Sequence, residues 1–270
     1  MTFAETYGPW ALVAGASDGV GAAFATALAQ RGVNIVLLAR REAVLEQVAA
    51  AIRAETGVQT RVLTVDLATD TATQTVIDAT ADLEIGMLVY CAGADPNFKP
   101  FLVEPIQAAE AMVTRNCMMP MRLCHHFAPA MVARGRGGIV IFGSGAGWAG
   151  APNMVAYGAS KAFDMVFAEA LWTELHDSGV DVLGLILGKT DTPSLRRLEH
   201  ERGVLASLDE SPRDAVSVDE VIDEALANLR NGPTWIVGET GRAAAQMIGA
   251  MPRNEAVRLM MQATRGSMGD

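Results

Sequence analysis

The chain has 270 residues, of which 50% are apolar and 19% are charged, and its formal net charge is −10. This length suits one large domain with a substantial buried core, and the composition excludes a disordered chain. The acidic balance disfavours binding to nucleic acid and to anionic membranes. The three cysteines lack the Cys and His spacing of a zinc site, so we expect reduced thiols, no metal and a cytoplasmic protein.

The sequence shows none of the patterns that direct a chain into a membrane. Its first ten residues, MTFAETYGPW, contain no basic segment followed by an apolar run, so no signal peptide is expected. The longest apolar runs have the length of a strand, far below the ~20 residues of a transmembrane helix.

Short aliphatic strands alternate with longer helical segments along the chain. Strands are expected at 11–14, 34–38, 59–65, 87–90, 138–142, 181–187 and 234–237, and helices at 19–31, 42–55, 71–81, 106–134, 154–177 and 218–230. Uniformly apolar strands separated by helices indicate a parallel sheet that is covered on both faces. Right-handed crossovers then predict an α/β fold with a doubly wound, Rossmann-type sheet, formed by residues 1–270 as a single domain.

Residues 190–217 interrupt this alternation with a long polar stretch that contains Pro193 and Pro212. Long connections within a compact domain are typically functional or mobile. This one follows the sixth strand, at the edge of the sheet where a ligand is expected. We therefore predict a substrate loop or lid that is mobile without ligand and closes over the bound cofactor.

A glycine-rich turn follows the first strand. Gly15, Gly19 and Gly21 form the pattern G-x-x-x-G-x-G. Glycine permits both a tight reversal of the chain and a close approach of the backbone to a pyrophosphate. The next helix directs its free N–H groups toward that phosphate. A turn without a ligand is the alternative, but the position in a βα unit favours a dinucleotide site, which also takes in Ser17, Asp18 and Val20.

Arg40 and Arg41 follow the second strand, where a dinucleotide fold meets the adenosine ribose. An acidic residue there holds the 2′-hydroxyl of NAD, whereas an arginine favours the 2′-phosphate of NADP. Arg40 therefore predicts a preference for NADP (NADPH) with NAD still possible, unless the pair is simply solvated. Asp66 and Leu67 follow the third strand and are candidates for adenine contacts, although an Asp there is commonly a helix cap.

Ser144, Tyr157 and Lys161 have the residue types and spacing of an acid–base site. Tyr157 and Lys161 are four residues apart and share one face of a helix. A neighbouring ammonium favours the phenolate and moves a tyrosine pKa toward the operating pH. Ser144 follows a strand, at the sheet edge where doubly wound folds bind ligands. Its hydroxyl is placed to hydrogen-bond a substrate oxygen.

Together these motifs resemble the short-chain dehydrogenase/reductase family over residues 10–195. The resemblance rests on AGASDGVG at 14–21, Cys91-Ala92-Gly93, Asn116, IFGSGAG at 141–147, YGASK at 157–161 and LGKTDT at 187–192. It implies that Tyr157 is the acid/base and that Lys161 lowers its pKa and holds the nicotinamide ribose. It also implies that Ser144 orients the substrate oxygen and that Asn116 positions a proton-relay water.

The resemblance also implies a further set of cofactor contacts, from Cys91, Ala92, Gly93, Gly188, Thr190 and Thr192. The chain departs from the family pattern at several places, namely Ala14, Tyr90-Cys91, Leu187 and Thr190, none of which removes a catalytic side chain. Pro120 has no N–H to give to the Asn116 carbonyl four residues earlier. That carbonyl is expected to bind a water, or else simply to be solvated at a kink.

The resemblance implies an NAD(P)-dependent carbonyl reductase or secondary-alcohol dehydrogenase that acts on a small-molecule ketone or alcohol and forms a homodimer or homotetramer. Trp148 and Met154 suggest an apolar, bulky substrate. Residues 94–100, 145–153 and 190–217 are expected to line its site. The alternative is a regulatory NADPH sensor with little turnover, but relatives of that type tend to lose the tyrosine or the lysine.

Overall fold

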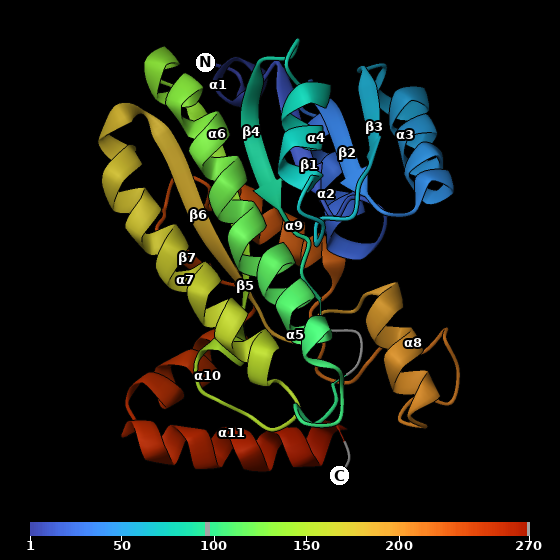
Figure 1. Cartoon of the computed structure of the whole chain (residues 1–270), viewed down its shortest axis with the longest axis vertical. Coiled ribbons are helices and arrows are strands. Elements are labelled where there is room, and N and C mark those ends of the chain that lie inside the picture. The colour runs from blue at the N-terminus through green and yellow to red at the C-terminus, as the bar shows by residue number, and fades with distance from the viewer. Residues whose placement is uncertain (95–97, 269–270) are drawn as a thin grey trace.

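The computed structural model describes residues 1–94 and 98–268, with side chains up to residue 264 (Figure 1). Its centre is a seven-stranded parallel sheet with the strand order β3-β2-β1-β4-β5-β6-β7. The strands are β1 (Trp10–Ala14), β2 (Asn34–Ala39), β3 (Thr60–Thr64), β4 (Ile85–Tyr90), β5 (Gly137–Ser144), β6 (Val180–Leu187) and β7 (Thr234–Ile236). The predicted doubly wound sheet is confirmed.

Helices cover both faces of this sheet. They are α1 (Phe3–Tyr7), α2 (Gly19–Ala29), α3 (Glu42–Thr56), α4 (Ala72–Ala79), α5 (Ile106–Val113), α6 (Met119–Arg134), α7 (Val155–Leu175), α8 (Pro193–Glu201), α9 (Val218–Ala227), α10 (Glu239–Gly249) and α11 (Arg253–Met268). Alternate strand residues face opposite sides, as the pleat requires. Val13 and Leu37 join one apolar core with α2, α3 and α9, whereas Leu12 and Val36 join a second with α4, α6 and α7.

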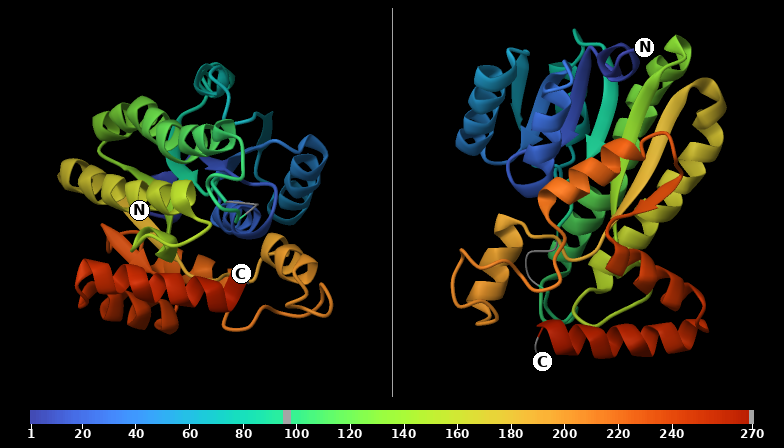
Figure 2. Two further views of the ribbon diagram at one scale, coloured as in Figure 1. Left: turned by 60° about the horizontal axis from the view of Figure 1, so that its bottom comes forward. Right: turned by 180° about the vertical axis from the view of Figure 1, so that it is seen from behind.

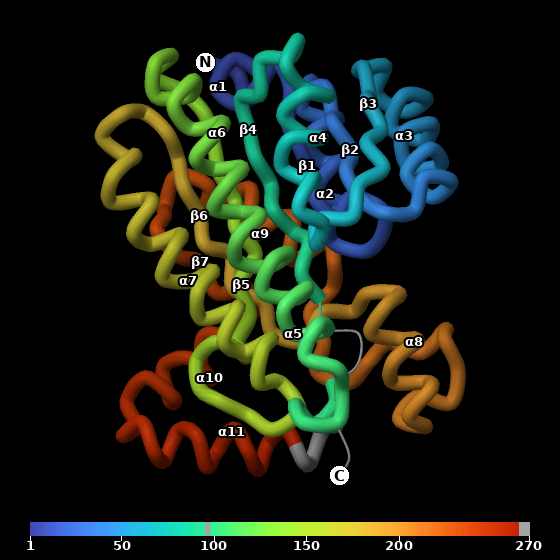
Figure 3. Tube along the Cα trace, viewed as in Figure 1, coloured from blue at the N-terminus to red at the C-terminus, as the bar shows by residue number. Residues whose placement is uncertain are grey.

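The predicted helix at 106–134 is interrupted by one wide π-helical turn, Thr114–Met118, between α5 and α6. In this turn the Met119 N–H donates to the Thr114 carbonyl, five residues earlier. The chain continues through it in nearly the same direction, as the trace in Figure 3 shows. Turns of this kind are frequent at functional sites, and this one carries Asn116.

The excursion at 190–217 contains the helix α8, although its polar sequence predicts a loop. Its two ends meet in a parallel bridge between Thr190 and Val216, so the excursion leaves and rejoins the sheet at one neck. Within it, Lys189 at the neck pairs with the buried Glu199 at 2.6 Å, and Asp191 pairs with Arg196. These ion pairs order a segment whose composition alone indicated a polar loop.

The carboxyl ends of the strands face α8, α10 and α11, which lie together at one end of the molecule (Figures 1 and 2). Arg253, at the start of α11, donates a hydrogen bond to the Trp148 carbonyl in the segment that follows β5. The last helix is thereby joined to the expected substrate site. Among the described residues, none of the helices combines the length and apolar composition that crossing a membrane requires.

Candidate active site

Ser144, Tyr157 and Lys161 lie together at the carboxyl edge of the sheet. Ser144 is the last residue of β5, and the other two occupy the first two turns of α7. The short turn 145–147 packs tightly on α7, since a Cβ at Gly147 would lie 2.7 Å from that helix's backbone. A Cβ at Gly158 would likewise lie 2.9 Å from the Ala146 carbonyl oxygen. These close approaches hold the serine-bearing turn against the helix that carries the tyrosine.

The Lys161 ammonium is buried and makes two hydrogen bonds. It donates to the Phe142 carbonyl at 2.7 Å and to the Asp164 carboxylate at 2.9 Å, and it lies 6.0 Å from the Tyr157 ring centroid. Burial is the largest influence on its pKa and lowers it, but Asp164, Tyr157 and Cys91 together raise the pKa of Lys161 above its usual value, with Asp164 first among them. Burial also raises the pKa of Asp164 to about 6, against the lowering effect of Lys161. Asp164 was not among the residues expected from the sequence.

Asn116 is fully buried and is joined to the helix that carries Tyr157. Its side-chain amide donates to Ser160 Oγ at 2.9 Å and to the Gly93 carbonyl at 3.3 Å, while Ser160 Oγ donates to the Tyr157 carbonyl at 2.8 Å. Gly93 has φ 133°, and a Cβ there would lie 2.8 Å from Asn116 Oδ1. Glycine is therefore required for this approach, and Ser160 is a connecting residue that sequence reasoning missed.

The wide turn changes which carbonyl Pro120 leaves without a donor. Because the Met119 N–H bonds five residues back, the proline nitrogen stands opposite Arg115 rather than Asn116. The Arg115 carbonyl accepts a hydrogen bond from the Tyr90 hydroxyl. The expected water at the Asn116 carbonyl stays a prediction. Tyr90, which departs from the family pattern, thus bonds to the wide turn just before Pro120.

The glycine turn after β1 forms a cradle that side chains would fill. Gly15 has φ 91°, and a Cβ there would lie 2.9 Å from the Ala92 nitrogen; one at Gly21 would lie 2.2 Å from the Gly15 carbonyl oxygen. Asp18 caps α2, with its Oδ1 accepting from the Gly19 N–H at 2.8 Å. The backbone of the glycine turn therefore lies next to the capped N-terminus of α2. This site is between β1 and β4, beside the Cys91-Ala92-Gly93 turn. This shape fits a dinucleotide pyrophosphate.

Basic side chains flank this cradle at the end of β2. Arg40 is exposed, and Arg41 donates to Ser17 Oγ at 3.1 Å and lies 3.5 Å from the Asp18 carboxylate. Arg41 is thus placed with the turn, although only Arg40 was singled out as a binding residue. Asp66 is exposed and accepts from the Ala68 N–H at 3.0 Å, so it closes a local turn and does not cap α4, which begins at residue 72. Its neighbour Leu67 is buried.

The segment after β6 places Thr192 against the glycine turn. A Cβ at Gly19 would lie 3.1 Å from Thr192 Cγ2. The Thr192 hydroxyl accepts from the Leu195 N–H and so caps α8, whereas a contact with a nicotinamide amide was expected. Thr190 is held in the bridge at the neck, and its hydroxyl donates to the Gly188 carbonyl at 3.4 Å. Arg197 on α8 pairs with Asp18 at 3.0 Å, which brings this helix onto the cradle.

Two of the expected lining segments meet above Tyr157. The Phe98 ring contacts the Tyr157 ring edge-on, with 6.2 Å between the ring centroids. The Arg202 guanidinium, just after α8, lies over the Phe98 ring, 5.6 Å from its centroid. Of the expected lining segment 94–100, residues 95–97 lie outside the described part of the chain. An aromatic side chain therefore borders the tyrosine, and a basic side chain lies against that aromatic ring.

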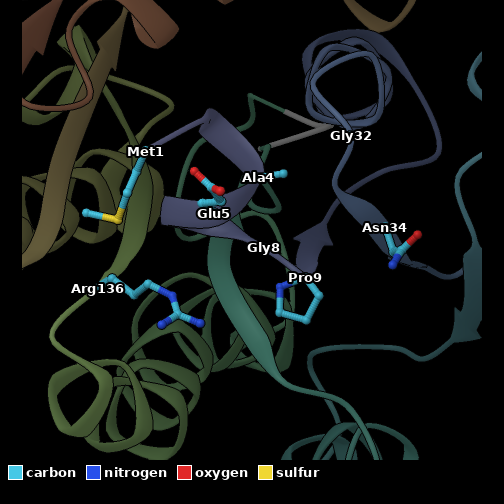
Figure 4. A pocket seen from close by; sticks show the side chains of 8 residues that line it. All are labelled: Met1, Ala4, Glu5, Gly8, Pro9, Gly32, Asn34 and Arg136. Carbon is cyan, nitrogen blue, oxygen red and sulfur yellow. The ribbon is translucent and has the colours of Figure 1, made fainter.

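A separate hollow of about 640 Å³ opens at the opposite edge of the sheet (Figure 4). It lies where strands begin, between α1, Pro9, Asn34 and Arg136. Strands β1, β2 and β5 run away from it, so it is separated from the tyrosine site by the length of the sheet.

Comparison with known proteins agrees with this arrangement. The family model for short chain dehydrogenase matches residues 9–203. The chain is 33% identical to the 7beta-hydroxysteroid dehydrogenase of Clostridium sardiniense, over 95% of this chain and 96% of that protein. A solved structure from work on the stereoselectivity of 7beta-hydroxysteroid dehydrogenase superposes with a TM-score of 0.87 and 32% identity, covering 96% and 99% of the two chains. The structure of a short-chain dehydrogenase from Sphingobium yanoikuyae in complex with NADPH superposes with a TM-score of 0.74 and 30% identity, covering 91% of this chain and 97% of that chain. The chain therefore belongs to the short-chain dehydrogenase family of oxidoreductases.

Proposed function

We propose that this oxidoreductase interconverts a bulky, apolar ketone and the corresponding secondary alcohol, with a preference for NADPH. The observation that carries the proposal is the convergence of Ser144, Tyr157 and Lys161 at the sheet edge beside the glycine cradle. An enzyme of this kind needs a proton donor for the substrate oxygen next to a dinucleotide site, and the two features adjoin here.

The chain's own residues divide the work of such a reaction. When bound, the cofactor supplies or accepts the hydride. Tyr157 gives its proton to the substrate oxygen in reduction and takes it back in oxidation, and Ser144 donates a hydrogen bond to the same oxygen. Lys161 holds the ribose and places a positive charge beside the phenol. Asn116 supports this helix through Ser160.

The preference for NADPH is supported by the charge at the end of β2. Arg40 is exposed there, and Arg41 reaches the Ser17 hydroxyl in the glycine turn. Neither residue that follows β2 is acidic, so a 2′-phosphate meets two guanidinium groups and no repelling carboxylate from that strand end. The similarity to a dehydrogenase in complex with NADPH agrees with this assignment.

The substrate class is supported by the aromatic surroundings of Tyr157 and by the named relatives. Phe98 lies against its ring, and Trp148 belongs to the segment that Arg253 of α11 contacts. Large rings suit a rigid apolar guest. Since similar proteins are 7beta-hydroxysteroid dehydrogenases, we include hydroxysteroids and oxosteroids in the proposed class.

The test measures NADPH consumption with aliphatic, aryl and steroid ketones, in parallel with NADH, and the reverse reaction with the corresponding alcohols. We expect turnover with bulky ketones, at least ~10-fold higher kcat/KM with NADPH than with NADH, and loss of turnover in Tyr157→Phe. Tight binding of NADPH without turnover of any ketone would contradict the proposal and favour a sensor.

We also propose that the chain forms a homodimer or a homotetramer. Apolar side chains are exposed on α7 and at the end of α5, among them Val155, Val166 and Val113. A second copy that covered them would remove this apolar surface from water. Light scattering at micromolar concentration is expected to give a mass of two or four chains, and a monomer would contradict this.

A further inference from the structure

Asp164 forms a buried ion pair with Lys161, and the proposed reaction assigns no role to the Asp164 carboxylate. The two side chains are three residues apart on α7, with 6% of the lysine side chain and 3% of the aspartate side chain exposed. Asp164 Oδ2 accepts from the ammonium at 2.9 Å. Among the described residues, none supplies a hydrogen bond to the other carboxylate oxygen, which is also buried.

The surroundings of Asp164 make a carboxylate costly at this position. Its other titratable neighbours are Tyr90 on β4, Cys117 in the wide turn and Cys124 on α6, all of them neutral groups whose pKa values burial raises. The face of α7 that packs on the sheet otherwise joins the second apolar core. A buried charge pair contributes little net stability compared with apolar side chains of similar size. The carboxylate is therefore better explained by its effect on Lys161 than by stability.

We propose that Asp164 is a positioning residue that holds Lys161 and sets the pH at which Tyr157 exchanges its proton. The inference rests on the proposed function, because it assigns the tyrosine as the proton donor.

The hydrogen bonds that Lys161 already makes limit the N–H donors left for a cofactor, and its ion pair affects the charge beside Tyr157. A lysine ammonium has three N–H donors, and two of them are directed to Asp164 and to the Phe142 carbonyl. One donor remains for a ribose hydroxyl. The carboxylate also helps to keep Lys161 charged beside the phenol, because burial lowers the pKa of this lysine and the Asp164 charge raises it.

Removal of the carboxylate lowers the pKa of Lys161. In Asp164→Asn the ammonium keeps the Phe142 carbonyl as an acceptor, but the carboxylate no longer opposes burial, which disfavours the charged form. Lys161 then loses its proton more readily, and a neutral amine does not favour the phenolate. The titration midpoint of Tyr157 is therefore expected to move to higher pH, by about one unit.

The tyrosine content makes this shift directly measurable. The chain has three tyrosines. Burial raises the pKa of Tyr7 to about 12 and that of Tyr90 well above its usual value. In a near-ultraviolet absorbance titration of the phenolates, the Tyr157 step is the one that Tyr157→Phe removes.

The experiment compares this absorbance titration in the unaltered protein, Asp164→Asn and Asp164→Leu, with Glu169→Gln as the matched control. Glu169 lies on the same helix, so its variant removes one negative charge without touching the pair. We expect both Asp164 variants to shift the step to higher pH and the control to leave it in place. The leucine variant, which suits the apolar surroundings, keeps the test valid if the asparagine variant does not fold.

The alkaline limb of ketone reduction is expected to shift in the same direction, because reduction needs the protonated phenol. An unchanged midpoint in both Asp164 variants would overturn the inference, and so would a downward shift, which would mean that Lys161 keeps its charge without the carboxylate. If no ketone is reduced, the proposed function fails, while the absorbance titration still decides the role of Asp164.

Discussion

The Arg197 guanidinium on α8 donates to the Asp18 carboxylate at 3.0 Å, joining two positions that are 179 residues apart in the chain. Asp18 also caps α2 at the glycine turn, so the excursion at 190–217 is held directly on the dinucleotide cradle. The contact gives the proposed lid a specific point of attachment.

Arg197→Ala is expected to loosen α8. An ion pair this exposed contributes roughly 0.2–1 kcal/mol, so amides of 194–211 are expected to exchange with solvent up to ~5-fold faster in the variant. In the unaltered protein, NADPH is expected to slow the same amides as the lid closes. Arg213→Ala, an exposed arginine in the same excursion, is the control. Equal exchange with and without NADPH would exclude a moving lid.

Tyr157→Phe is expected to retain cofactor binding and to lower kcat by ~10²–10⁴, the usual share of a general acid. The variant keeps the ring that contacts Phe98 and removes only the proton. Steady-state kinetics and NADPH fluorescence measure the two effects separately. Tyr7→Phe is the control, because the Tyr7 hydroxyl pairs with Asp181 far from the site. Turnover near that of the unaltered protein would contradict the assignment of the tyrosine.

Arg40→Asp is expected to weaken NADPH binding by ~10-fold or more and to spare NADH, because attraction of the 2′-phosphate becomes repulsion. Dissociation constants for both cofactors give the result by fluorescence titration. Arg53→Asp on α3 makes the same charge change away from the turn and is expected to leave both constants unchanged. Equal affinity of the unaltered protein for the two cofactors would disprove the preference.

Tyr90→Phe is expected to lower the free energy of unfolding by ~0.5–1.5 kcal/mol, because the hydrogen bond from the Tyr90 hydroxyl to the Arg115 carbonyl is lost. The shape of the side chain is retained, so the change isolates one hydrogen bond. Urea unfolding with an unchanged slope measures the loss. A free energy equal to that of the unaltered protein would show that the carbonyl has another partner.

Local pattern was sufficient for much of the fold. Strand positions followed from apolar runs, because burial on both faces of a parallel sheet demands such runs. The close approach at Gly15 was implied by residue type, since it needs a residue without a Cβ. The grouping of Ser144 with Tyr157 and Lys161 followed from motif spacing. Their catalytic and cofactor roles remain predictions.

The sequence by itself therefore determined the doubly wound sheet and the side chains at its carboxyl edge, because hydrophobic periodicity and short motifs are local properties. Only the tertiary structure decided the wide turn at Asn116, the attachment of α8 to Asp18 and the burial of Asp164 beside Lys161. The spacing of three between those last two residues is visible in the sequence, but whether such a pair is solvated or buried depends on which elements pack over it. In water such a pair has little effect, whereas inside the protein we propose that it sets the charge beside Tyr157.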